Sequence, residues 1–149
     1  MNSVRNFKLR TEIESRKIYR IIDANLNRSR EGLRVCEEIA RFVLNDKSLT
    51  NEFKRLRHRI TNCIRYYPAQ LKEIVSARDS EGDIGRPKDP LERKRCNWKE
   101  ISLANLERVK ESLRVLEEFS ELLDKKIADR FKRFRFKAYD IEKRLIARF

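Results

Sequence analysis

The hydrophobic positions of the chain recur at helical spacing in four segments. In residues 12–45, 49–67, 98–123 and 127–145, apolar or small residues return at steps of three and four, which predicts one buried stripe on each of four helices. The stripe residues are Ile22, Leu26, Ser29, Leu33, Cys36, Ala40 and Val43; Leu49, Phe53, Leu56, Ile60, Cys63 and Tyr67; Leu106, Val109, Leu113, Leu116, Ser120 and Leu123; and Ile127, Phe131, Phe134, Ala138, Ile141 and Leu145. We therefore expect an all-α protein.

A fifteen-residue segment occurs twice. Residues 24–38 read ANLNRSREGLRVCEE and residues 104–118 read ANLERVKESLRVLEE, with ten of the fifteen positions identical. The partner helices match as well, because FKRLR at 53–57 aligns with FKRFR at 131–135. The chain is thus one helical hairpin used twice. Two amphipathic hairpins bury their stripes by packing together, which predicts a four-helix-bundle-like fold with pseudo-two-fold symmetry.

The 149 residues predict a single helical domain. Repeat 1 covers about 13–77, a connector covers 78–97, and repeat 2 covers about 98–148. We expect residues 1–12 to be a loose basic lead-in before the first helix.

Turn and cap signals predict where the helices begin and end. Ser48 or Thr50 is available to cap the second helix. Pro68 should bend or end that helix, with a short helical piece following it. Asn97, with Glu100 three residues later, has the pattern of a capping box for the third helix.

Gly32 lies in the middle of the first predicted helix. A glycine there costs ~1 kcal/mol relative to alanine. Its counterpart in the second copy is Ser112, which is also small. The pattern favours a close helix contact at Gly32 over a close approach by a ligand.

The charge and the cysteines restrict the class of protein. A net charge of +13, from 37 basic and 24 acidic residues, indicates either an anionic partner or a heavily solvated surface. Cys36, Cys63 and Cys96 form no CxxC pair, so neither a disulfide framework nor a zinc site is indicated. Cys36 and Cys63 lie on stripes and are expected in the core.

The basic N-terminus lacks the apolar core of a signal peptide, and no apolar run reaches membrane-spanning length, so we expect a cytoplasmic protein.

Six polar positions are identical in the two copies. They are Asn25, Arg28, Glu31, Arg34, Glu37 and Glu38, with their counterparts Asn105, Arg108, Glu111, Arg114, Glu117 and Glu118. Ion pairs on the helix surface explain part of this set, and we favour that interpretation for Glu37 and Glu117. The asparagines form no ion pair, so a buried amide bond or a ligand contact is as good an explanation as a solvated surface.

The connector begins with ARDSEGDIG at 77–85. Asp79 and Asp83 on a glycine-containing turn could bind Mg²⁺, and Arg78 could bind phosphate. The alternative is an ordinary acidic turn.

His58 is the single histidine of the chain and lies among arginines. It is expected to be a half-buried packing residue, with phosphate contact as the alternative. The basic clusters around 54–57 and 132–135 are interpreted as solvated helix faces, again with phosphate contact as the alternative.

Residues 18–42, the Arg57-His58 pair, the loop at 77–85 and residues 104–118 together resemble the small all-helical hydroxymethylpyrimidine-phosphate kinase family, which occurs alone or fused ahead of thiamine-phosphate synthase. The resemblance covers about 15–148. It implies transfer of the ATP γ-phosphate to 4-amino-5-hydroxymethyl-2-methylpyrimidine phosphate in thiamine biosynthesis. The chain lacks the barrel of roughly 200 residues that synthase chemistry would need.

Phosphoryl transfer requires positioning and charge neutralisation. We therefore assign Arg34, Arg78 and Arg114 as catalytic residues and Asp79 and Asp83 as ligands of Mg²⁺, with ATP as the donor. The expected substrate-binding residues are Asn25, Arg28, Glu31, His58, Asn105, Arg108 and Glu111. One active site is expected in each chain, with completion by a second subunit of a homodimer and contact with thiamine-phosphate synthase as further hypotheses.

The sequence is also compatible with two other functions. A nucleic-acid-binding helical protein would explain the charge, but no DNA-binding motif accompanies it and the basic residues are spread over all four helices. A non-catalytic module that docks on thiamine-phosphate synthase is the other alternative.

Overall fold

The computed structural model describes residues 2–86 and 94–149, and this part of the chain contains helices and no strands. The elements are α1 (Asn2–Glu38), the π-helical turn η1 (Ile39–Val43), α2 (Lys47–Cys63), the 3₁₀ turn η2 (Ile64–Tyr66), α3 (Leu71–Ser76), α4 (Trp98–Glu121) and α5 (Lys125–Ile146). The all-α prediction is confirmed. No helix in the described residues is both long enough and apolar enough to cross a membrane.

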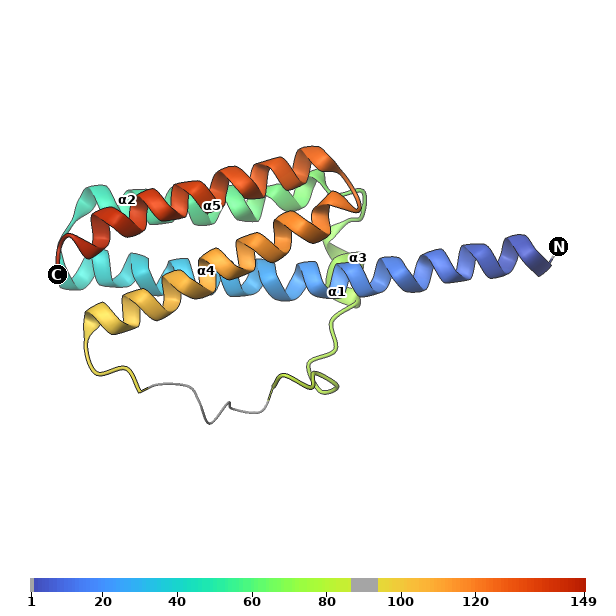
Figure 1. Cartoon of the computed structure of the whole chain (residues 1–149), viewed down its shortest axis with the longest axis horizontal. Helices are drawn as coiled ribbons and strands as arrows, with labels where there is room; N and C mark the ends of the chain where they lie inside the picture. Colours follow the sequence, from blue (N-terminus) through green and yellow to red (C-terminus); the bar gives the residue numbers. More distant parts are fainter. Residues whose placement is uncertain (1, 87–93) are drawn as a thin grey trace.

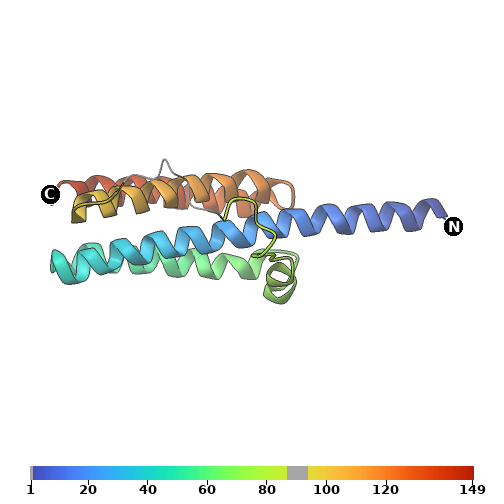
Figure 2. The same ribbon diagram turned by 90° about the horizontal axis from the view of Figure 1, so that it is seen from below.

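The four long helices form a bundle of two hairpins. Helix α1 packs against α2 and α4, and α5 packs against the same two helices. Figure 2 shows the hairpins as two layers, with α1 and α2 in one and α4 and α5 in the other. The first part of α1 extends beyond the bundle, and the described connector residues, 78–86 and 94–97, lie on the side opposite α2 and α5 (Figure 1).

The predicted stripes form the core, with two differences. Leu123 is only partly buried, and Val43 is 37% exposed. Val43 lies in η1, where the wider π-helical turn changes the register, so that Ile39 becomes buried in its place. Cys36 and Cys63 are core residues, as predicted.

Two predicted helix starts are wrong. Helix α1 begins at Asn2 and not near residue 12, because no glycine or proline precedes Gly32 to interrupt a segment of good helix formers. Helix α2 is capped by Asp46, whose Oδ1 accepts from the Leu49 backbone N–H at 3.0 Å. Thr50 instead donates its hydroxyl to the Asp46 carbonyl at 2.7 Å.

The capping box of α4 is confirmed. Asn97 Oδ1 accepts from the Glu100 backbone N–H at 2.9 Å. Glu100 Oε2 accepts in return from the Cys96 backbone N–H at 2.7 Å. The reciprocal pair satisfies donors that the first turn of the helix leaves without partners.

Gly32 lies at a close contact between the two repeats. A Cβ atom at this position would lie 2.8 Å from the Asn105 carbonyl oxygen and 2.8 Å from Val109 Cγ2. The absence of a side chain therefore lets α1 and α4 pack at this distance, as predicted.

Glu37 and Glu117 are buried, contrary to their interpretation as surface ion pairs. Glu37 Oε2 accepts from Arg57 Nε of α2 at 2.9 Å. At the equivalent place in the second repeat, Glu117 Oε2 accepts from Arg135 Nη2 of α5 at 2.8 Å. Each repeat therefore contains an ion pair that joins its two helices.

Candidate active site

The connector is attached to α1 by a bidentate ion pair. Arg78 donates from Nε to Asp23 Oδ2 at 2.7 Å and from Nη2 to Asp23 Oδ1 at 2.8 Å. Asp23 is 6% exposed, and a buried carboxylate is strongly destabilising unless a cationic group is paired with it. Arg78 supplies that cation. The hydrogen bonds to Asp23, together with its charge, raise the pKa of Arg78. The pair places the start of the connector beside the middle of α1.

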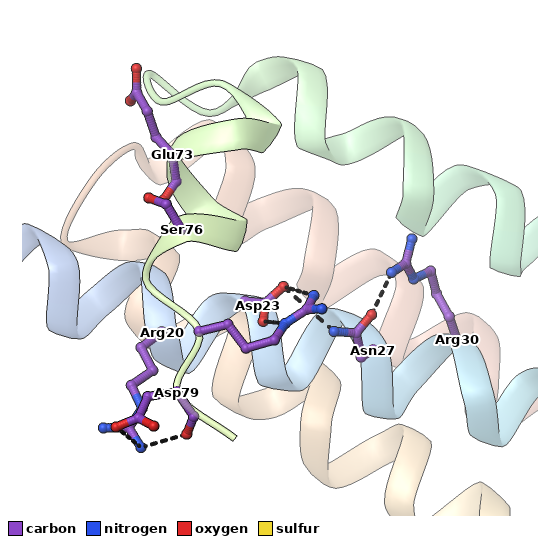
Figure 3. A network of polar contacts seen from close by, with 8 residues as sticks. Arg20, Asp23, Asn27, Arg30, Glu73, Ser76 and Asp79 are labelled. Carbon is purple, nitrogen blue, oxygen red and sulfur yellow. Dashed lines mark hydrogen bonds and ion pairs between the residues drawn. The ribbon is translucent and has the colours of Figure 1, made fainter. Parts of the chain in front are cut away.

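Polar contacts continue from Asp23 along α1. Asn27 Nδ2 lies 3.5 Å from Asp23 Oδ1, and Arg30 Nη2 donates to Asn27 Oδ1 at 2.6 Å (Figure 3). In the other direction, Arg20 Nη2 donates to the Asp79 carbonyl at 3.2 Å and lies 4.0 Å from Asp79 Oδ2. Basic and amide groups therefore line one side of α1 where the connector passes.

The two connector aspartates each stabilise a tight turn. Asp79 Oδ1 accepts from the Gly82 backbone N–H at 2.8 Å, and Asp83 Oδ1 accepts from the Gly85 backbone N–H at 2.9 Å. A Cβ atom at Gly82 would collide with the Asp79 carboxylate. Both aspartates accept these turn hydrogen bonds through Oδ1, so the turns do not occupy Oδ2.

Two adjacent pockets lie between the connector and the bundle. The first, of about 580 Å³, is lined by Arg20, Asp23, Ala24, Asn27, Arg78, Asp79, Ser80, Glu81, Asp83 and Arg86. The second, of about 610 Å³, is lined by Lys17, Arg20, Ile21, Ala24, Asn25, Arg28, Gly82, Asp83, Ile84, Val115 and Phe119. They share Arg20, Ala24 and Asp83. We call the first the charged pocket and the second the mixed pocket, and together they form the connector site.

Five of the predicted site residues meet at the connector site. Arg78, Asp79 and Asp83 line the charged pocket, and Asn25 and Arg28 line the mixed pocket. Asn25 donates its Nδ2 to the Ile21 carbonyl at 2.8 Å, which leaves Oδ1 as an acceptor.

The other predicted residues lie outside these two pockets. Arg34 and Arg114 form ion pairs with Glu37 and Glu38 and with Glu117 and Glu118, respectively. The expectation that these two arginines enclose one pocket with Asp79 and Asp83 is therefore not met, because each is held by acids of its own helix.

Four further predicted residues lie on α1 and α4. Glu31 is exposed on α1, and Arg108 is exposed on α4. Asn105 donates its Nδ2 to the Ile101 carbonyl at 2.8 Å, repeating the bond of Asn25. Glu111 lines a separate pocket of about 380 Å³ together with Arg114 and Arg135.

His58 lies on α2, away from the connector. It is exposed, contrary to the expectation of a half-buried packing residue. It lines a different pocket together with Arg55 and Arg59.

Sequence reasoning missed Arg20, which lines both pockets of the connector site. A signal for it exists, because polar residues recur on α1 at steps of four and three, on one face of the helix. This polar stripe consists of Arg16, Arg20, Asp23, Asn27 and Arg30. Arg16 Nη2 also contacts the segment before the connector, donating to the Ser76 carbonyl at 3.2 Å.

The connector aspartates suit Mg²⁺ held jointly with a phosphate ligand. The described residues contain no group of three or more His, Cys, Asp or Glu side chains that could hold a metal alone. Mg²⁺, however, is commonly bound by one or two carboxylates together with substrate phosphates and water. Asp79 and Asp83 border the same charged pocket and are the two carboxylates there that could take part in such a site.

Comparison of the sequence with known proteins identifies the family of this chain. The ThiD2 family matches residues 20–144. The chain is 43% identical over 130 residues to a thiamine-phosphate synthase of Nostoc punctiforme, covering 87% of this chain and 35% of that protein. It is 37% identical over 130 residues to a thiamine-phosphate synthase of Rhodopirellula baltica, covering 87% of this chain and 34% of that protein.

The chain thus spans about a third of the length of these curated relatives. No solved structure matches it. The family match covers α2, α3 and α4 completely and includes Arg20, Asp23, Arg78, Asp79 and Asp83 of the connector site. The chain belongs to the ThiD2 family.

Proposed function

We propose that the protein is an ATP-dependent kinase that converts 4-amino-5-hydroxymethyl-2-methylpyrimidine phosphate to the diphosphate in thiamine biosynthesis. The observation that carries the proposal is the connector site, where arginines and two aspartates line one pocket beside a second, partly apolar pocket. Family membership and relatives named thiamine-phosphate synthase support the pathway. The resemblance to the small helical kinases supports the reaction.

The charged pocket suits phosphate groups. Arg20, Arg78 and Arg86 line it and can donate charge-assisted hydrogen bonds to phosphate oxygens. Asp79 and Asp83 would hold Mg²⁺, which would neutralise the negative charge of the phosphates. The attacking group is an ionised phosphate oxygen, so the reaction needs positioned charges and no strong general base.

The mixed pocket suits the pyrimidine. Ile21, Val115 and Phe119 give it an apolar wall that can contact a flat ring. Asn25 Oδ1 can accept a hydrogen bond from the exocyclic amine, since its Nδ2 is already occupied by the Ile21 carbonyl. Arg28 could bind the phosphate already present on the substrate.

The experiment that tests the proposal is a turnover assay with the pure protein, Mg²⁺ and ATP. We expect the pyrimidine monophosphate to be consumed and the diphosphate and ADP to form, and we compare the unphosphorylated pyrimidine in parallel. Asp79→Asn and Asp83→Asn should each abolish turnover without reducing helicity. Asp129→Asn, an exposed aspartate on α5, is the matched control and should retain full activity. Full activity in both connector variants would contradict the metal assignment.

A non-catalytic module that docks on thiamine-phosphate synthase is the second candidate. It is favoured by relatives of that name that are about two and a half times as long as this chain. Co-purification with the synthase, combined with no consumption of the monophosphate, would support this candidate over the kinase.

A further inference from the structure

A basic pocket lies on the side of the bundle opposite the connector. It has a volume of about 590 Å³ and is lined from α2 by Lys54, Arg55, His58 and Arg59 and from α5 by Lys137. Helices α2 and α5 pack together on the side of the bundle away from the connector (Figure 1). We call this hollow the α2–α5 pocket, and it shares no lining residue with the connector site.

The charges of this pocket are not balanced by the acids that the structure describes. Among the described residues, Lys54, Arg55, His58 and Arg59 form no ion pair. Glu52 also borders the pocket, but it is already bound by Lys137 at 3.1 Å and by Arg144. The pocket therefore presents several cationic groups with no acid left to neutralise them.

This concentration of charge opposes helix formation. Arg55 and Arg59 are four residues apart on α2, and like charges at that spacing destabilise a helix. The basic character is also present in both repeats, because Arg59 corresponds to Lys137 and Arg55 corresponds to Arg133. An anionic ligand that bridges α2 and α5 would offset the repulsion.

We propose that the α2–α5 pocket is a second anion site, which binds a compact ligand with two or more linked phosphate groups. Paired guanidinium groups one helical turn apart suit adjacent phosphates, since each can donate two parallel hydrogen bonds. Lys54 adds a point charge from α2, Lys137 lines the pocket from α5 while paired with Glu52, and His58 supplies an imidazole. The site stands independently of the proposed kinase activity.

The single histidine makes the site directly observable. The imidazole proton resonances of His58 can be followed by NMR in the whole protein while inorganic pyrophosphate is added at constant pH and ionic strength, without Mg²⁺. We expect a saturable shift with a midpoint at lower concentration than that of orthophosphate, because pyrophosphate carries more negative charge and offers a separate phosphate to each guanidinium group. Equal midpoints for the two anions, or pyrophosphate binding that leaves the His58 resonances unmoved, would overturn the proposal.

Variants locate the residues that bind the anion. Arg55→Ala combined with Arg59→Ala should raise the midpoint about 100-fold, about tenfold for each guanidinium group that is removed. Lys72→Ala combined with Lys99→Ala removes the same charge from exposed positions on α3 and α4, and should change the midpoint less than about twofold. If both double variants weakened pyrophosphate binding equally, the effect would come from net charge alone, and the proposed site would be refuted. Circular dichroism checks that each variant is folded.

Two further ligands identify the source of the phosphates. If ATP has a lower midpoint than pyrophosphate, the site binds nucleotides. If pyrophosphate has the lower midpoint, the site binds free diphosphate. Either result supports the proposed site. A single-stranded oligonucleotide that shifts His58 at lower concentration than either ligand would overturn the proposal, because the pocket would then be part of a nucleic-acid-binding surface.

Discussion

Arg78 and Asp23 lie 55 residues apart and form a two-point ion pair across the start of the connector. Two parallel hydrogen bonds specify the direction of the guanidinium plane as well as its distance. The orientation of the connector relative to α1 therefore depends on an arginine at this position.

Arg78→Lys should reduce kcat/KM of the proposed kinase about tenfold, because lysine keeps the charge but cannot form the two parallel bonds. The melting temperature should change little, because lysine still supplies a positive charge to the buried Asp23 carboxylate. Steady-state kinetics and thermal melting measure the two effects. Arg65→Lys, an exposed arginine in η2, serves as the control and should leave kcat/KM unchanged.

Gly32→Val should destabilise the fold by about 2 kcal/mol, because its Cβ would be forced against the Asn105 backbone and α4 would have to move. Urea unfolding measures the change. Ser112→Ala, at the equivalent position of the second repeat, should cost less than about 1 kcal/mol because it removes only a hydroxyl group. A Gly32→Val protein as stable as the wild type would show that the two repeats can separate at no cost.

Glu37→Ala should lower the free energy of unfolding by about 2–3 kcal/mol, because it leaves the largely buried Arg57 guanidinium without its partner. Glu117→Ala should cost a similar amount through Arg135. The neighbouring Glu38→Ala should cost less than about 0.5 kcal/mol, since the ion pair of Glu38 is with Arg34, a half-exposed arginine of its own helix. Equal costs at positions 37 and 38 would contradict a distinct role for the buried pair.

The pKa of the Cys36 thiol is raised to about 12, mainly by burial and secondly by the charge of Glu142, from a usual value of 9.0. The unfolded thiol therefore loses its proton first as the pH rises. The stability that Cys36 contributes should be fully present below about pH 9 and should decline toward pH 12. The stability advantage of the wild type over Cys36→Ser, measured by urea unfolding, should shrink across that range, and a constant advantage would contradict this linkage.

Helical periodicity predicted most of the core, because the buried stripes of the four long helices repeat with little interruption. The exception at Val43 came from a π-helical turn, which periodicity alone does not reveal. The cap of α2 was missed because Asp46, Ser48 and Thr50 are all good caps within one turn, and only the backbone path selects among them.

The sequence allowed only part of the connector site to be predicted. Its aspartates and Arg78 stood out because they occur in the one long segment without helical periodicity. Arg20 did not, since its role depends on which face of α1 the connector crosses. The same limit applies to Arg57, which sequence reasoning placed in a solvated cluster but which contacts Glu37 on the neighbouring helix.

The contact at Gly32 also shows that the two hairpins differ in the residue that each carries at this position. The first repeat meets its neighbour with a bare backbone, whereas the second carries the hydroxymethyl group of Ser112 at the same position. Two copies of either hairpin alone would place the same residue at both contacts. A protein assembled from two identical halves would therefore not reproduce this asymmetric contact between α1 and α4.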